Sequence, residues 1–591
     1  MRYQDRKPSF TRPSSKKLFD DSTQTLRIFG LSILSSAMLT VSVYADSGST
    51  EYTAQQVDSS QPRLLAALSV DKPTGLADFR NGLPDARQTS TPTWFSRSQL
   101  SESGSRLWNA VRNAKLLGID PERLHHTALN EILGSGTKFD ARQKLEVEHL
   151  LDSSFKFLIT EVTAGRVSPK ESQRYWFEEV ETPDTEQLLE LAKSSPGALG
   201  NILADIVHNN RNIEPLLDKI SEYQVIEAAG GWPQLSEGPT IEPGDTSPRV
   251  STLRMRLVVS GDLETRFANG PNGANAETYS DELQQAVERF QTRHGLLVDG
   301  LVGRGTRAAL NVTVAERIEQ MQLNVERHRW LPNQYASRHI ITNIPDYKLR
   351  VVENGSTTLE MPVVVGKPKH QTPVFSEDMQ FLVVNPTWTV PRSITNKELV
   401  PKELNNPGSL QASGFHVLNR NGSRIPFEQV PYNAWHEPKF PYTLRQGPGK
   451  RNALGKVKFM MPNKYAIYLH DTPAKKLFGK QRRAYSHGCV RLGDPMALAN
   501  HLLGGQGWSQ DRIDKLFAQQ KTKRVNLDQP IPNHIVYLTS WVDAEGTLQF
   551  RNDIYKLDRS LKVALAKESE QRQKLINNFD QYQPVLAANE E

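Results

Sequence analysis

Residues 468–495 read YLHDTPAKKLFGKQRRAYSHGCVRLGDP, and this stretch decides how the C-terminal half of the chain is interpreted. The run that leads into it, NKYAIYLH, is rich in aliphatic and aromatic residues and predicts a β-strand that ends at His470. Fifteen residues separate His470 from the segment Ser486-His487-Gly488-Cys489. A histidine at the end of a strand is thus followed by a glycine-containing turn that carries a cysteine.

Cys489 is the only cysteine, which excludes a disulfide within the chain, a four-cysteine zinc site and a CxxC redox pair. A thiol with an unperturbed pKa of about 8.5 is a poor nucleophile until a base takes its proton, and His470 is the candidate base. Gly488 leaves room for an acyl group and lets backbone amides face a developing oxyanion. Arg491 can lower the thiol pKa or hold a substrate carboxylate.

Other uses of these side chains remain open. His470, His487 and Cys489 with one water could form an open zinc site, although Gly488 would then have no role. Cys489 could instead pack as a small apolar residue, His487 could shape the turn, and Arg491 could be a structural ion-pair partner. Asp471 would point to the opposite face of the strand from His470 and is left out of the site.

Residues 336–560 are dominated by Val, Ile, Thr and aromatic residues between Pro, Gly and Asn, and they predict a mainly-β domain. One of its predicted strands is MQFLVVNPTWTV, residues 379–390. Residues 392–455 interrupt the pattern and are too long for an ordinary loop, which predicts an inserted lid near the site.

The histidine, its spacing to SHGC, and the hydrophobic and basic residues that follow resemble the signature of the L,D-transpeptidases of the YkuD type. The resemblance implies a β-sandwich-like catalytic domain and a cysteine acyl transfer without a cofactor. Cysteine would attack the carbonyl of the L-centred third residue of a peptidoglycan tetrapeptide stem and release D-Ala. An amine of a neighbouring stem would then take the acyl group and form a 3-3 cross-link.

Carried onto this chain, the resemblance makes Cys489 the nucleophile and His470 the proton donor and acceptor. Gly488 and the amides around it would form the oxyanion site, and the supporting residues would be Ser486, His487 and Arg491. The family also implies acylation by carbapenems. Trp435, Phe440 and Tyr442 in the predicted lid would suit a grip on a sugar-peptide.

Residues 247–312 contain AVERFQTRHGLLVDGLVGRGTRAAL (286–310), which resembles the three-helix peptidoglycan-binding domain of wall enzymes. The polar loop at 270–276 departs from that pattern and could block a glycan groove. Residues 97–240 predict a helical scaffold domain, with a long helix that starts at Asp140. The fold class is therefore multi-domain α+β: helical scaffold, peptidoglycan-binding-like domain, and catalytic β domain with a lid.

Residues 1–45 join a basic segment to an apolar run and end in Val43-Tyr44-Ala45, which predicts a secretory signal peptide or an uncleaved signal anchor. Residues 46–96 predict a flexible linker, and residues 566–591 a polar, frayed tail. The expected location is the periplasm, with membrane contact only through an uncleaved N-terminal segment.

The chain has 591 residues, enough for several domains, and its net charge of +6 does not demand a nucleic-acid partner. Peptidoglycan stems and glycan are the expected partners, and other wall-synthesis enzymes are further candidates. Three functional alternatives stay open: water as acceptor, which gives a carboxypeptidase or endopeptidase; a lipoprotein as acceptor; and a wall-binding protein without enzyme activity.

Overall fold

The computed structural model describes residues 39–45, 48–54, 93–134, 138–180, 182–209, 212–271 and 275–588. The chain divides into two units, residues 1–61 and 62–591. In the first, β1 (Leu39–Ala45) pairs antiparallel with β2 (Gly48–Ala54). Residues 1–38 of the predicted signal and residues 55–92 of the predicted linker lie outside the described residues. In the described part of the chain, no helix is both long and apolar enough to span a bilayer.

The helical scaffold domain starts earlier than predicted. Trp94 is fully buried, and its indole Nε1 donates a hydrogen bond to Asp152 Oδ1 at 2.6 Å. A short hairpin follows, β3 (Phe95–Ser96) with β4 (Gln99–Leu100). The predicted linker, residues 46–96, is therefore wrong at its C-terminal end, because the buried indole fixes this segment to the helices.

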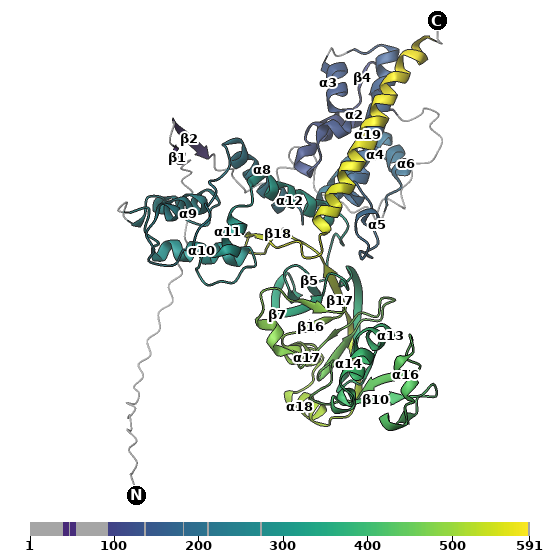
Figure 1. Ribbon diagram of the computed structural model, residues 1–591. Helices are drawn as coiled ribbons and strands as arrows, with labels where there is room; N and C mark the ends of the chain where they lie inside the picture. Colours follow the sequence, from purple (N-terminus) through teal and green to yellow (C-terminus); the bar gives the residue numbers. More distant parts are fainter. Residues whose placement is uncertain are drawn as a thin grey trace, which may run out of the picture. The chain divides into compact units, whose positions relative to one another are not determined.

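The predicted long helix from Asp140 is confirmed. Asp140 accepts from the Gln143 amide, the Gln143 side chain accepts from the Asp140 amide, and this capping box starts the helix. The helices of this part of the chain (Figure 1) are α2 (Glu102–Arg112), α3 (His126–Gly134), α4 (Ala141–Ala164), α5 (Pro169–Ser172), α6 (Thr185–Ser194), α7 (Pro196–Asn209) and α8 (Glu214–Ala228).

The peptidoglycan-binding-like region has the three predicted helices, α9 (Pro248–Val259), α10 (Asp281–Arg293) and α11 (Arg304–Leu310). The Gln291 side chain links two parts of the sequence motif at 286–310, the helix and the Asp299-Gly300 turn. Its Oε1 accepts from the amides of Asp299 and Gly300, and its Nε2 donates to the Leu301 carbonyl. Gly300 has a φ of +69°, which suits glycine, so the glutamine and the Asp-Gly turn hold each other. Residues 272–274 of the loop at 270–276 lie outside the described residues.

Helix α12 (Val314–His328) joins this region to the catalytic domain. The Asn324 side chain donates to Thr539 Oγ1 at 2.8 Å and accepts from the Thr539 amide at 2.9 Å. Thr539 immediately precedes a hairpin formed by β18 (Ser540–Val542) and β19 (Leu548–Phe550).

The catalytic domain is built on a nine-stranded sheet of order β15-β7-β16-β14-β13-β8-β17-β5-β6. Because β6 also pairs with β7, the sheet closes on itself. Its strands are β5 (Arg338–Asn343), β6 (Lys348–Glu353), β7 (Ser356–Gly366), β8 (Phe375–Val384), β13 (Val457–Met460), β14 (Leu469–His470), β15 (Ala484–Ser486), β16 (Val490–Leu492) and β17 (Lys523–Val536).

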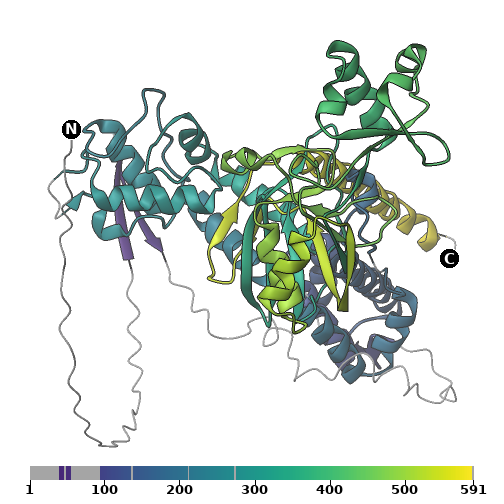
Figure 2. The same cartoon turned by 90° about the horizontal axis from the view of Figure 1, so that it is seen from below.

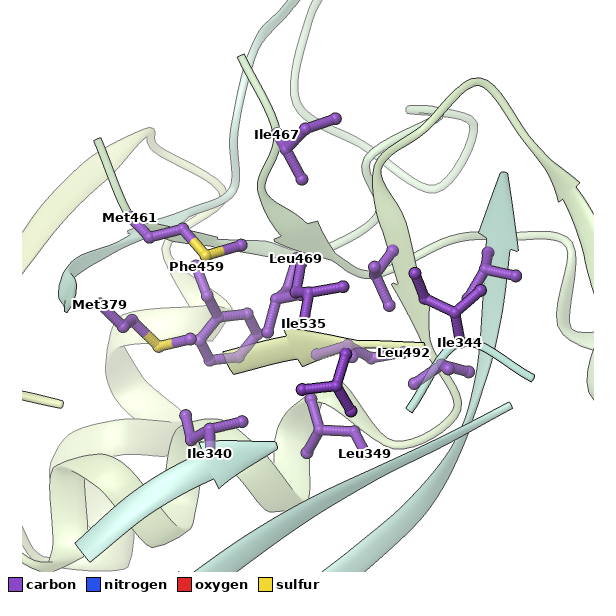
Figure 3. Close-up of a cluster of buried hydrophobic side chains, with 14 of the residues drawn as sticks. Ile340, Ile344, Leu349, Met379, Phe459, Met461, Ile467, Leu469, Leu492 and Ile535 are labelled. Atoms are coloured by element: carbon purple, nitrogen blue, oxygen red, sulfur yellow. The ribbon is translucent and has the colours of Figure 1, made fainter. Parts of the chain in front are cut away.

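Buried aliphatic side chains fill the interior of this sheet and pack against α17 (Pro495–Gly504) and α18 (Gln510–Ala518). Figure 3 shows Phe459, Leu469 and Ile535, from three different strands, in one cluster. All three are at most 1% exposed. The strands that carry the chemistry are thus fixed from their inner face. The predicted mainly-β catalytic domain is confirmed.

The insertion has a sheet of its own, of order β11-β10-β12-β9, and its own hydrophobic core. Figure 2 shows its elements in green as a separate lobe. They are β9 (Trp388–Thr389), α13 (Arg392–Ile394), a π-helical turn at Thr395–Leu399, α14 (Val400–Asn405), α15 (Ser409–Ala412), β10 (Phe415–Leu418), β11 (Arg424–Ile425), α16 (Tyr432–His436) and β12 (Thr443–Gln446).

Two predictions about the insertion need correction. The strand predicted at 379–390 is broken, because β8 ends at Val384 and β9 pairs with β12 of the insertion. Trp435 and Phe440 are not displayed for a ligand, because they are 9% and 0% exposed in the core of the lobe. Tyr432, at 74%, is an aromatic residue that the lobe does expose.

The predicted frayed tail is also wrong. Helix α19 runs over Leu557–Ala588, through most of the segment predicted to be irregular. Glu568 on this helix forms ion pairs with Arg123 at 2.7 Å and with Arg166 at 2.8 Å, both in the scaffold domain. The C-terminal helix is therefore ordered by charged contacts that its polar composition conceals.

Candidate active site

Three basic residues lie in one row across neighbouring strands. In the pairing of β13, β14 and β16, His470 is opposite Lys458 on one side and Arg491 on the other. Their sequence neighbours Phe459, Leu469 and Val490 also pair and are all fully buried. Because side chains alternate between the faces of a sheet, Lys458, His470 and Arg491 share the face that points away from this core. We call these three residues the basic row.

The turn that carries Cys489 is held by Ser486 and Thr372. The Ser486 hydroxyl donates to the Cys489 carbonyl at 2.6 Å and accepts from the Gly488 amide at 3.2 Å. Thr372 Oγ1 donates to the Gly488 carbonyl at 2.7 Å. Gly488 has a φ of +117°, and a Cβ there would lie 3.2 Å from the Ile467 side chain. This position therefore requires glycine on two grounds.

The His470 ring is held in one tautomer. Its Nδ1 lies 2.5 Å from the carbonyl oxygen of Asp471. A carbonyl can only accept, so Nδ1 carries the proton and Nε2 is left with its lone pair. Burial, and then the charge of Arg491, lowers the pKa of His470 to about 3. The imidazole is therefore neutral at physiological pH and able to accept a proton.

Asp471 contributes through its backbone, and its carboxylate is engaged elsewhere. That carboxylate accepts from the amides of Lys456 at 2.8 Å and Thr472 at 2.7 Å, and it pairs with Lys475 at 2.8 Å. The prediction that the Asp471 side chain turns away from His470 is consistent with these contacts. The role of its carbonyl was missed, because main-chain acceptors leave no mark in the sequence.

Cys489 is partly buried and lies against the segment before β14. Its Sγ is 3.7 Å from the carbonyl oxygen of Ala466. Burial raises the thiol pKa to about 11, although hydrogen bonds from Tyr468 and the charges of Arg491 and Lys458 act against this rise. The resting sulfur is therefore a protonated thiol. Among the described residues, no hydrogen bond joins it directly to His470.

Tyr468 and Lys458 are two neighbours of the thiol that sequence reasoning missed. The centroid of the Tyr468 ring lies 5.6 Å from that of the His470 ring. Lys458 Nζ lies 5.5 Å from the centroid of the Tyr468 ring. Tyr468 stands two residues before His470, a spacing that could have marked it. Lys458 is twelve residues from His470 and meets it only through strand pairing, so no local signal identifies it.

Comparison with known proteins assigns three regions of the chain to families. Residues 337–523 match the family model of the L,D-transpeptidase catalytic domain, YkuD. Residues 86–212 match that of the Scaffold domain, and residues 246–310 that of a peptidoglycan binding domain. The catalytic domain is an L,D-transpeptidase domain of the YkuD family. The resemblances drawn from the two sequence motifs are thereby confirmed.

Among curated proteins, one of Haemophilus influenzae named "Putative L,D-transpeptidase" is 35% identical over 246 residues, 42% of this chain and 49% of its own length. The chain thus spans about half the length of that relative. The N-acetylmuramoyl-L-alanine amidase CwlM of Mycobacterium tuberculosis is 38% identical over 80 residues, 13% of this chain and 20% of its own.

Solved structures similar to this chain include an L,D-transpeptidase from Xylanimonas cellulosilytica, 15% identical with a TM-score of 0.17, which covers 51% of this chain and 99% of its own. Another is an LD transpeptidase in complex with imipenem, 15% identical with a TM-score of 0.15, which covers 34% of this chain and 59% of its own. Likenesses at such scores add nothing to the description of the fold.

Within the L,D-transpeptidase domain, the His487 side chain contacts the insertion. Its Nε2 lies 2.5 Å from Glu398 Oε1 and 3.2 Å from Lys367 Nζ. Glu398 belongs to the π-helical turn of the insertion, and its pKa is lowered by His487 and Lys367 against the effect of burial. His487 therefore connects the SHGC segment to the inserted lobe.

The alternative zinc site is not assembled. His487 contacts Glu398, and the Nδ1 of His470 is bonded to a carbonyl. Across the described ranges, no group of three His, Cys, Asp or Glu side chains is arranged to hold a metal ion.

The strand predicted over 463–470 is shorter than expected. Asn463 Oδ1 accepts from the amides of Tyr465 and Ile467 and turns the chain, so only Leu469–His470 pair as β14.

Proposed function

We propose that this protein is a peptidoglycan L,D-transpeptidase in which Cys489 is the nucleophile and His470 the general base and acid. The observation that carries the proposal is the position of a single cysteine, in a turn fixed by Ser486 and Thr372, on the segment that pairs with the strand of His470. The Nε2 of that histidine has no hydrogen-bond partner among the described residues. The match to the L,D-transpeptidase family model gives independent support.

The two pKa values define the resting state as a thiol beside a neutral imidazole. When the donor carbonyl meets the sulfur, His470 Nε2 takes the thiol proton and the S–C bond forms. The tetrahedral intermediate then expels the terminal amino acid, whose amine receives that proton from the imidazolium. The product is a thioester on Cys489. The missing Cys–His hydrogen bond does not exclude this role, since such contacts often tighten only in the substrate complex.

In the second half of the reaction, the acyl group leaves the sulfur, and the proton transfers occur in the reverse order. An amine of a neighbouring stem attacks the thioester, and the imidazole takes its proton. The C–S bond breaks and the imidazolium returns the proton to sulfur, which leaves a 3-3 cross-link. The Gly488 amide already donates to Ser486, whereas the Cys489 amide has no acceptor among the described residues. We therefore assign the Cys489 amide as an oxyanion donor.

The insertion is proposed to cover the bound stem as a lid. Support comes from the contact of Glu398 with His487, which joins the lobe to the residue two positions before Cys489. Removing the tip around the exposed Tyr432 should impair cross-linking of stem peptides more than acylation by a small β-lactam. Equal loss of both, with a lower melting temperature, would make the lobe a structural part of the domain.

The setting of the reaction follows from the proposal. Its substrate lies outside the inner membrane, so the predicted signal at residues 1–45 would deliver the protein to the periplasm. The peptidoglycan binding domain would hold it on the wall.

The decisive experiment supplies purified tetrapeptide muropeptides to the full-length protein and identifies the products by mass. Cross-linked dimers with loss of D-Ala support the proposal, and shortened monomers alone would make the enzyme a hydrolase. Because the family resemblance implies acylation by carbapenems, incubation with the carbapenem imipenem is a second test. One adduct is expected on the protein and none on Cys489→Ala.

A further inference from the structure

Two cations of the basic row, Lys458 and Arg491, have no ion-pair partner among the described residues. The Nε of Arg491 is buried without a hydrogen-bond acceptor, and none of its guanidinium atoms is in an ion pair with a described residue. Lys458 likewise has no carboxylate partner among the described residues, and its contact is the Tyr468 ring. The nearby carboxylate of Asp471 is occupied by two amides and Lys475. The row therefore carries two uncompensated positive charges.

Such an arrangement is unfavourable unless something fills it. Burying a charge without a partner raises the free energy of the folded state, and burial lowers the pKa values of both Lys458 and Arg491. A negative charge on Cys489 would raise both pKa values again, because both cations lie within electrostatic reach of the sulfur. An anion brought to the reacting sulfur would thus meet a site already built for it.

We propose that Lys458 and Arg491 bind the terminal carboxylate of the donor peptide, an inference that rests on the proposed transpeptidase function. In the donor, one residue is expelled, so its carboxylate lies one residue beyond the carbonyl that Cys489 attacks. Successive Cα atoms are about 3.8 Å apart, so that carboxylate stays close to the sulfur. A guanidinium can hold it through two parallel bonds and the ammonium as a point charge.

This site would make the enzyme selective for the number of residues in the donor peptide. A peptide one residue longer carries its carboxylate about 3.3–3.6 Å farther away, beyond the two cations when the same carbonyl is at the sulfur. The pair would therefore select stems that end one residue after the attacked carbonyl. It would reject longer stems without any steric wall.

The two cations could instead serve only to stabilise the thiolate, and a ratio of rates separates the two roles. Acyl-enzyme formation is followed by intact mass with a tetrapeptide stem and with the same peptide as its terminal amide. An effect on the thiol slows both peptides equally and cancels in the ratio. An effect on the carboxylate slows only the free acid.

In the wild-type protein the free acid should react about 10- to 100-fold faster than the amide, as expected for hydrogen bonds to a charged group. Lys458→Met and Arg491→Met, tested separately, should each bring the ratio at least several-fold closer to one. Lys476→Met, which removes an exposed lysine from the loop between His470 and Ser486, should keep the wild-type ratio. Equal rates of acid and amide in the wild type would overturn the inference, as would an unchanged ratio in both variants.

The comparison of the free acid with the amide uses the wild-type protein, so it does not depend on whether a variant folds. If the wild type forms no acyl enzyme with either peptide, the proposed function fails, and binding of both peptides to Cys489→Ala by calorimetry still decides the carboxylate site. Tighter binding of the acid that weakens in Lys458→Met/Cys489→Ala would support the site. Equal binding of acid and amide would reject it.

Discussion

The peptidoglycan binding domain and the basic row both bury cationic side chains, and two arginines of the binding domain, Arg293 and Arg254, have surroundings opposite to those of the basic row. In the binding domain, Arg293 donates to both carboxylate oxygens of Asp262 at 2.6 Å, and Arg254 donates to three backbone carbonyls. In the basic row, the buried Nε of Arg491 has no acceptor among the described residues. The first set of charges stabilises a fold, whereas the second is available to a ligand.

This contrast predicts where substitutions should act. Changes near Asp262 should lower stability and spare the chemistry, and changes near Cys489 should remove the chemistry and spare stability. Each experiment below therefore measures both the free energy of unfolding and acylation of Cys489.

The largest effect is expected from Cys489→Ser. Cross-linking should fall by about 10³-fold or more, because His470 would have to activate a hydroxyl that is far less acidic than a thiol. The melting temperature should stay within about 1–2 °C, since the two side chains are similar in size. Retained cross-linking by a homogeneous preparation of this variant would refute the assignment of the nucleophile.

His470→Ala should slow acylation by roughly 10²–10⁴-fold, the usual effect of removing a general base. Stem-peptide binding, measured by calorimetry, should change less than the rate. His487→Ala is the matched control, because that ring contacts Glu398. A larger loss in His487→Ala than in His470→Ala would transfer the role of base to the other histidine.

In the binding domain, Asp262→Ala should lower the free energy of unfolding by about 3–5 kcal/mol, because it leaves the buried Arg293 charge without its partner. Urea or thermal unfolding followed at the binding domain would measure this. Imipenem acylation of the folded protein should keep its rate. Glu264→Ala, which removes a carboxylate exposed by 65%, provides the control and should have little effect. Unchanged stability in Asp262→Ala would remove the contrast between the two regions.

A smaller effect is expected from Glu398→Gln, which weakens the contact between the insertion and His487. Exposed pairs contribute about 0.2–1 kcal/mol, so cross-linking of stem peptides should fall by at most about five-fold. Imipenem acylation should be unaffected, since a small lactam does not need the lid. Glu437→Gln places the same change elsewhere in the lobe. If both variants behave alike, Glu398 has no special role in joining the lobe to the site.

The smallest expected effect is that of pH on acylation. The competent pair is a thiol with a pKa of about 11 and a neutral imidazole with a pKa of about 3. Protonation of His470 removes the base only near the lower value, and ionisation of Cys489 occurs only near the higher one. The rate constant for imipenem acylation at low concentration should therefore be flat between about pH 5 and 9. A midpoint near pH 6–7 would instead indicate a thiolate–imidazolium pair.

Much of the fold could be predicted from sequence. The helix cap at Asp140 is a local feature that forms as expected, and Gly488 of the SHGC segment lies in a turn, as predicted. The catalytic roles of Cys489 and His470 stay predictions. The basic row could not be predicted in the same way. Lys458 reaches His470 only because β13 pairs with β14, and strand register is set by the whole sheet.

The errors have similar causes. Trp435 and Phe440 look like ligand-binding aromatics until the insertion proves to have a core that they fill. The segment at 463–468 has strand composition, but the Asn463 side chain captures two amides and Ala466 adopts a φ of +56°, so the strand is lost. The tail is polar throughout, and its helix depends on contacts such as Glu568 with Arg123, which lie far away in sequence.

The root of the insertion has a consequence for how this domain could be rebuilt. Val384 and Val457, which flank the insertion, are paired residues of adjacent antiparallel strands, and the Asn385 amide donates to the Lys456 carbonyl at 2.7 Å. The Asn452 side chain fastens the same junction through the Pro386 carbonyl. The lobe is thus inserted between β8 and β13 at a point where these two adjacent strands are already paired. It could be exchanged for a short turn, or for a lobe of another length, without moving the strands on either side, so an enzyme engineer could treat substrate cover and reaction centre as separate parts.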